Sequence, residues 1–270
     1  MLSIAKGGPT AREFWHKPAL RAAQPEKRLR IVLGRFHEIS LLTTDIRESV
    51  EFYERLGFTQ ASTNDTWTHP YGVLTDGRAL IGLHQRRFAA PALTFVHANV
   101  ASFANELEAR GIVLETRNTS EDSFNEIGFR DPDGQSVMVL EARTYSPATR
   151  REEDTSLCGY FIEISLPSTD FERARQFWEP MGFVATEEPD APYAHLPLTS
   201  DHLDLAFHRP RTLDRPMLVF RDPTMRDRLA RIRALGVKET GELPRGLPPA
   251  ANALIEAPEG TALLLLEGES

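Results

Sequence analysis

The feature that most constrains the fold of this chain is a long internal repeat. The stretch "FHEISLLTTDIRESVEFYERLGF" begins at Phe36, and "FIEISLPSTDFERARQFWEPMGF" begins at Phe161. Further landmarks recur at almost the same spacing, in the pairs Asp45 and Asp170, Gly57 and Gly182, Phe95 and Phe220, Gly111 and Gly236, Gly134 and Gly260, and Glu141 and Glu267. A match this long and regular indicates a tandem duplication, so we expect two copies of one architecture.

The repeat divides the chain into four parts. Residues 1–35 precede it and are expected to form an N-terminal arm, residues 36–145 are the first copy, and residues 160–270 are the second. Between the copies, residues 146–159 are expected to form a linker, and most of them lie in the polar and charged stretch "RTYSPATRREEDTSL", which has the composition of an inter-domain linker. We therefore predict two domains joined by this linker.

Each copy reads twice as a strand, a helix and then short strands. In "FHEISLL", Ile39 and Leu41 alternate with Glu38 and Ser40, which predicts a strand with one apolar and one polar face. Helices are predicted to begin after capping residues and to end before glycines, as at Asp45 and Gly57, and at Asn99 and Gly111. These patterns predict an α+β fold of four βαβββ units, which form two cup-shaped mixed β-sheet domains with the helices packed outside.

Charge, cysteine content and hydropathy argue against several classes of function. The net charge of −8 argues against a nucleic-acid partner, because binding to phosphates needs a basic surface. No apolar run approaches the roughly 18 to 20 residues of a membrane span, and residues 1–35 lack the features of a secretory signal. A single cysteine, Cys158, excludes an internal disulfide and favours a cytoplasmic location.

The order of these motifs resembles that of the vicinal oxygen chelate superfamily, which includes glyoxalase I, bleomycin-resistance proteins and extradiol dioxygenases. The matching stretches are "TTDIRESVEFYERLGF", "ALTFV" followed by "LEARGI", and "FRDPDGQSVMVLE", and the second copy keeps "STDFERARQFW", "MLVF" and "APEGTALLLLE". In that superfamily two βαβββ units form one cup. The resemblance therefore implies a fused version with two cups, in which the usual homodimer is either replaced by pairing within the chain or retained as a dimer of fused chains.

The resemblance also implies four inward-facing strand positions for metal ligands. In the first copy these positions hold Glu38, Gly82, Ala92 and Met138, and in the second they hold Glu163, Ala206, Met217 and Leu264. Catalytic zinc and iron sites usually have at least three protein ligands, and each cup offers one carboxylate. No metal or other cofactor is predicted, and a divalent metal is expected only if this assignment of positions is wrong.

Two histidines add a second donor to each cup. His84 and His208 lie two residues beyond the second position, so they share its face, but no third ligand is evident. Hydrogen bonding of these histidines to a neighbouring strand is the more favoured interpretation. His37 is expected to point away from the cup, because neighbouring strand residues face opposite sides.

Three roles are open for Glu38. It could be a structural partner of Arg86, it could bind a ligand, or it could act as a general base with a pKa that burial raises. Glu163 has the same alternatives, with Arg221 as its structural partner. The sequence alone does not decide between them.

The alternation of side chains predicts which residues line each cup. In the first cup the candidate ligand-binding residues are Glu38, Ser40, His84, Arg86, Thr94 and Met138. In the second cup they are Glu163, Ser165, His208 and Arg221. The strand in "TALLLLEG" is apolar on both faces, which suggests a second cup that is filled or holds an apolar ligand. We therefore expect polar recognition in the first cup.

These expectations lead to one function hypothesis and its rivals. The leading hypothesis is a tandem glyoxalase/bleomycin-resistance-like protein that has lost the usual metal ligands and binds a small, partly apolar molecule in a cup. The alternative is an enzyme of the same superfamily, either a metal-free isomerase or lyase with Glu38 as general base, or a metal-dependent lyase or extradiol-type dioxygenase with substituted ligands. A scaffold with both cups filled is a third possibility.

Overall fold

The computed structural model describes residues 32–62, 67–120, 124–142 and 156–269. Most of the expected arm at 1–35 and of the expected linker at 146–159 lies outside these residues. The first copy contains β1 (Arg35–Leu42), α1 (Ile46–Arg55), β2 (Thr59–Ala61), β3 (Tyr71–Thr75), β4 (Leu80–His84), β5 (Ala92–His97), α2 (Val100–Ala109), β6 (Leu114–Asn118), β7 (Glu126–Arg130) and β8 (Ser136–Glu141).

The second copy repeats this order. It contains β9 (Tyr160–Pro167), α3 (Phe171–Trp178), β10 (Val184–Ala185), β11 (His195–Thr199), β12 (Asp204–His208), β13 (Met217–Asp222), α4 (Met225–Ala234), β14 (Ala253–Glu256) and β15 (Ala262–Glu267).

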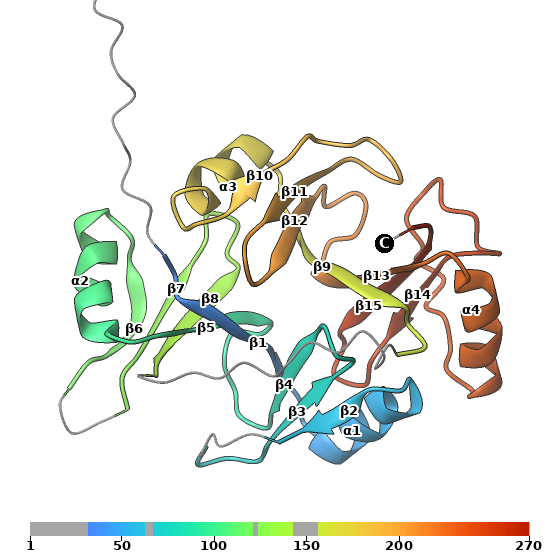
Figure 1. Cartoon of the computed structure of the whole chain (residues 1–270), viewed down its shortest axis with the longest axis horizontal. Helices are drawn as coiled ribbons and strands as arrows, with labels where there is room; N and C mark the ends of the chain where they lie inside the picture. Colours follow the sequence, from blue (N-terminus) through green and yellow to red (C-terminus); the bar gives the residue numbers. More distant parts are fainter. Residues whose placement is uncertain (1–31, 63–66, 121–123, 143–155, 270) are drawn as a thin grey trace, which may run out of the picture.

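Each copy forms one mixed sheet. The first, sheet A, has the strand order β2-β3-β4-β1-β5-β8-β7-β6, and the second, sheet B, has the order β10-β11-β12-β9-β13-β15-β14. In sheet A, β1 and β5 are antiparallel neighbours at the centre, and each has a parallel partner on its other side, β4 and β8 respectively. Two units of one topology therefore meet at the centre of each sheet, and the predicted α+β fold with two sheet domains is confirmed (Figure 1).

The fourth unit departs from the predicted pattern. After α4, the expected first strand is reduced to an isolated bridge between Glu239 and Ile255, so sheet B has seven strands where sheet A has eight. The following segment, "GELPRGLPPAANA", is rich in proline, which has no backbone N–H to donate to a neighbouring strand. The proline-rich composition thus accounts for the missing strand.

The helices begin at the capping residues that the sequence predicts. The Asp45 side chain accepts hydrogen bonds from the backbone N–H groups of Arg47 and Glu48, and Asn99 accepts one from Ser102. Just after α1, Gly57 has a φ of 93°, which an L-residue with a side chain rarely adopts. No helix within the described ranges is both long enough and apolar enough to cross a membrane.

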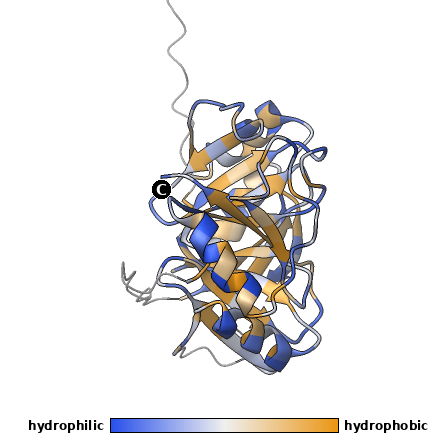
Figure 2. Cartoon of the chain, turned by 90° about the vertical axis from the view of Figure 1, so that its right-hand side faces the viewer, coloured by the Kyte–Doolittle hydropathy of each residue, from blue (hydrophilic) through white to orange (hydrophobic). Residues whose placement is uncertain are grey.

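The helices pack against the convex side of the sheets. Strand residues such as Ile39 and Leu83, which alternate with the cup-facing positions, belong to one continuous apolar core that also contains Leu56 after α1 and Trp178 of α3. Figure 2 shows the same division, with hydrophobic residues concentrated on the strands and hydrophilic ones on the outer turns of the helices. Because the core includes residues of both copies, the two sheets share one interior.

The two copies hold each other by reciprocal contacts. In α1, the Tyr53 hydroxyl donates to Glu259 Oε1 at 2.7 Å and the Ser49 hydroxyl donates to Glu259 Oε2 at 2.8 Å. In α3, Trp178 Nε1 donates to Asp131 Oδ2 at 3.1 Å. Glu259 and Asp131 lie in the turns of the last hairpins of their copies. The first helix of each copy is therefore bound to the last hairpin of the other copy.

Candidate functional site

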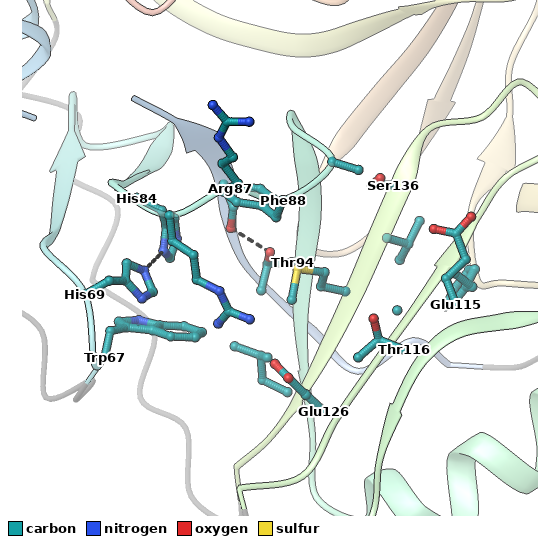
Figure 3. Close-up of a pocket in the computed structure, with 18 residues that line it drawn as sticks. Trp67, His69, His84, Arg87, Phe88, Thr94, Glu115, Thr116, Glu126 and Ser136 are labelled. Carbon is teal, nitrogen blue, oxygen red and sulfur yellow. Dashed lines mark hydrogen bonds between the residues drawn. The ribbon is translucent and has the colours of Figure 1, made fainter. Parts of the chain in front are cut away.

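The concave side of sheet A encloses a cavity of about 270 Å³. Five of the six residues predicted for the first cup line it, namely Ser40, His84, Arg86, Thr94 and Met138. Glu38 does not line the cavity. Aromatic and polar side chains complete the walls, with Trp67 and His69 on one side and Glu115, Thr116 and Glu126 on the other (Figure 3).

Glu38 lies behind the wall of the cavity and is 1% exposed. Its carboxylate accepts hydrogen bonds from the Ser40 hydroxyl at 2.7 Å and from the Tyr71 hydroxyl at 2.5 Å. His84 Nε2 lies 2.7 Å from Glu38 Oε1. The partner of Glu38 is thus His84 and not Arg86, which was the structural alternative from the sequence.

Gly82 makes room for this carboxylate. A Cβ atom at position 82 would lie 2.1 Å from Glu38 Cδ and 2.2 Å from each of its carboxylate oxygens, which is closer than real Cβ contacts come. Gly82 pairs with Ser40 in the parallel register of β1 and β4, so it faces the same side of the sheet as Glu38. The Glu38 carboxylate therefore occupies the space that any side chain at position 82 would need.

Hydrogen bonding outweighs burial in setting the charge of Glu38. Burial alone would raise the pKa of this carboxyl, but the hydrogen bond from His84, the charges of His37 and His84 and the hydrogen bond from Tyr71 lower it below its usual value. The expectation that burial raises the pKa of Glu38 toward that of a general base was wrong, because three donors stabilise the charged form.

A β-bulge places His37 beside Glu38. The pairing of β1 with β5 shifts between Phe36 and Glu38, so His37 is the extra residue of a β-bulge. A bulge breaks the alternation of faces, and His37 Nε2 lies 3.9 Å from Glu38 Oε2. His37 was predicted to point away from the cup, and it does not line the cavity, but the bulge brings its ring close to the Glu38 carboxylate.

An aromatic cluster surrounds His84 at the cavity. Its Nδ1 lies 3.0 Å from His69 Nε2, and its ring lies 4.6 Å from that of Tyr71 and 5.2 Å from that of Trp67, centroid to centroid. Burial and the charges of His84 and Arg86 lower the pKa of His69. The sequence did not predict Trp67, His69 or Tyr71 as site residues, because Trp67 and His69 precede β3 and strand alternation does not extend to them.

The second cup is filled by its own side chains. Strand residues Val219, Leu264 and Leu266 pack with Tyr193, Leu213, Met217, Leu254 and Ala262 into a separate apolar cluster. Leu243 and Leu247, from the proline-rich segment after α4, pack against this cluster. Of the two possibilities that "TALLLLEG" suggests, a filled cup or an apolar ligand, this packing favours the filled cup, and the proline-rich segment helps to cover it.

Glu163 has surroundings unlike those of Glu38. Ala206 stands where the first copy has Gly82, so a methyl group takes the space that the Glu38 carboxylate uses. His208 Nδ1 pairs with the Ser165 hydroxyl at 2.8 Å. Burial raises the pKa of Glu163 to about 7, with Asp204 adding to the rise and the charge of Arg221 partly opposing it. Equivalent carboxyl groups in the two copies therefore have different environments, and the added methyl group of Ala206 is one of the differences between them.

The sequence of the first copy is similar to one protein family. Residues 35–139 match the model of the Glyoxalase/Bleomycin resistance protein/Dioxygenase superfamily. Sheet B repeats the strand order that the matched residues form in sheet A. No curated protein is similar enough in sequence to count as a match.

Solved structures of dioxygenases share the fold. Homoprotocatechuate 2,3-dioxygenase of Brevibacterium fuscum, as a variant, has a TM-score of 0.58 and 17% identity over 88% of this chain and 72% of the enzyme. The same enzyme of Arthrobacter globiformis has a TM-score of 0.56 and 18% identity over 87% and 79%. A catechol 2,3-dioxygenase has a TM-score of 0.54 and 16% identity over 86% and 87%. Identities this low establish the fold alone.

The four positions that the resemblance implies for metal ligands hold few side chains with donor atoms. In the first cup, Gly82, Ala92 and Met138 leave Glu38 as the one oxygen donor at the four implied positions, and that carboxylate already accepts hydrogen bonds from neighbouring side chains. In the second cup, Met217 and Leu264 belong to the apolar filling. Across the described ranges, no three side chains of His, Cys, Asp or Glu form a group that could hold a metal ion.

Proposed function

We propose that this protein binds a small, partly apolar molecule in its first cup. The observation that carries the proposal is the difference between the cups, because the first encloses a cavity while the second is packed with apolar side chains. A cavity of about 270 Å³ is close to the lower end of ligand sites, roughly 300 Å³, which favours a ligand of one or two rings.

The walls of the cavity support this ligand chemistry. Trp67, Phe88 and Met138 offer apolar surface for a ring, while hydroxyl and charged side chains around them offer a few polar contacts. Arg86 forms no ion pair within the described residues and remains available to an acidic substituent. Two observations count against Glu38 as the base of an enzyme: it does not line the cavity, and its pKa is lowered.

Calorimetric titration with a panel of aromatic compounds tests the proposal. The panel includes catechol and homoprotocatechuate, after which structurally similar dioxygenases are named. Gly128→Leu is the blocking variant, because Gly128 lines the cavity and a Cβ there meets Thr116 at an ordinary 3.4 Å. We expect saturable binding that this variant abolishes while its thermal unfolding remains cooperative.

Two results would contradict the proposal. One is the absence of binding by every compound of the panel at millimolar concentration. The other is binding that Gly128→Leu leaves unchanged, since the ligand would then lie outside the first cup.

A further inference from the structure

A chain of hydrogen bonds joins the wall of the first cavity to Glu38. The hydroxyls of Ser40 and Thr94 both line the cavity, and their oxygen atoms lie 2.7 Å apart, as the dashed line at Thr94 in Figure 3 shows. The Ser40 hydroxyl also lies 2.7 Å from Glu38 Oε1. The three side chains are 1–3% exposed, so bulk water does not compete for these contacts.

The direction of each hydrogen bond in the chain is fixed. Glu38 receives hydrogen bonds from Tyr71 and Ser40 and therefore acts as an ionised carboxylate, which can only accept. Ser40 has one hydroxyl hydrogen and donates it to Glu38. Thr94 must therefore donate its own hydrogen to the Ser40 oxygen.

We propose that this wall selects ligands by an N–H or O–H donor, because Thr94 and Ser40 have only lone pairs left to offer. The inference rests on the proposed binding function and specifies the ligand as an aromatic molecule with a donor group on its ring or ring system. A ligand that places an acceptor at these hydroxyls meets lone pairs, and behind them the negative charge of Glu38, so it loses affinity.

The second copy lacks this chain, which shows that the fold does not require it. Val219 stands at the position of Thr94, and Ser165, the counterpart of Ser40, pairs with His208. Because His208 Nε2 lies 2.9 Å from the Leu213 carbonyl and must donate to it, His208 Nδ1 is the acceptor and Ser165 is the donor. A valine in place of Thr94 is therefore compatible with this architecture.

Indole and benzofuran are the matched probes, since they have nearly the same shape and differ by an N–H in place of a ring oxygen. Calorimetric titration of the full chain is expected to give indole an affinity about tenfold higher, in line with one hydrogen bond to a charge-linked acceptor. The double variant Ser40→Ala/Thr94→Val should bring the two affinities to within about twofold. A matched variant at exposed positions far from the cavity, Thr59→Val/Ser102→Ala, should keep the preference for indole.

Each other outcome has a definite meaning. Equal affinities of the wild type for indole and benzofuran would overturn the inference and leave the proposed binding function standing. A preference for indole that survives in Ser40→Ala/Thr94→Val would also overturn it, because other residues would then accept the hydrogen bond from the ligand. If neither probe binds at millimolar concentration, the proposed function fails for ligands of this size and the inference fails with it.

Discussion

Replacing Gly82 by alanine adds one methyl group in the space that the Glu38 carboxylate occupies. The new Cβ would lie 2.1 Å from Glu38 Cδ, so the carboxylate must move by about 1.5 Å to reach a normal contact. Its hydrogen bonds to Ser40, Tyr71 and His84 span 2.5–2.7 Å and cannot all survive that shift. The φ of Gly82 is not positive, so the backbone itself accepts alanine.

The expected cost follows from the contacts that break. Losing the partners of a buried charge destabilises a protein by about 3–5 kcal/mol. Alanine in place of glycine in a strand stabilises the folded protein by roughly 0.5–1 kcal/mol, because it lowers the entropy of the unfolded chain. We therefore expect Gly82→Ala to lower the free energy of unfolding by about 3 kcal/mol, which is large for a single added methyl group.

A double-mutant cycle with Glu38→Ala isolates the cause. Urea unfolding of the wild type, both single variants and the double variant gives the coupling between positions 38 and 82. In the Glu38→Ala background the methyl group meets no carboxylate, so Gly82→Ala should be neutral or stabilising by up to about 1 kcal/mol. A Gly82→Ala cost that is equal in both backgrounds would refute the reasoning, because the methyl group would then clash with something other than Glu38.

Two further predictions concern the second cup and the contact between the copies. The pKa of Glu163 rises from a usual value of 4.5 to about 7, so the folded protein keeps a proton that the unfolded chain releases, and stability falls as the pH rises between these values. Between about pH 4 and pH 8 the free energy of unfolding of the wild type should fall by up to about 3 kcal/mol because of Glu163, and urea unfolding should show that Glu163→Gln lacks this part of the fall. The same fall in both proteins would contradict a raised pKa of Glu163. Tyr53→Phe removes the donor to Glu259 and should lower the free energy of unfolding by about 1–2 kcal/mol in a single transition; separate transitions for the copies would disprove a shared core.

The parts of the fold that local rules control were predictable from the sequence. Capping residues such as Asp45 and Asn99 act on the N–H groups next to them, so they mark helix starts without knowledge of the tertiary structure. The alternation of side chains likewise brought Ser40 and Thr94 to one face of adjoining strands. The repeat pattern predicted a regular strand near Glu239, but the structure has only an isolated bridge there. The prolines that follow explain the difference, because they cannot donate a backbone hydrogen bond to a neighbouring strand.

The environment of Glu38 depends on features that a sequence does not display. The Glu38 carboxylate occupies space that is free because Gly82, on the neighbouring strand β4, has no Cβ. The pairing of β1 with β4 is set by the tertiary fold and is not visible in the local sequence. The bulge at His37 breaks the alternation on which the prediction relied. Trp67 and His69 precede β3 in an irregular segment, so only the folded chain shows that they reach the cavity.

The reciprocal attachment of each first helix to the other copy's last hairpin has a consequence for how the two cups could diverge. Two separate single-copy chains that paired through these contacts would form a homodimer, and its two cups would be identical because one gene encodes both. Its stability would also depend on protein concentration. Fusion makes the pairing intramolecular and lets each half change alone, as Gly82 and Ala206 have done. A fused chain, unlike a homodimer, can therefore keep one cup packed with side chains as a fixed support while the other cup changes to suit a ligand.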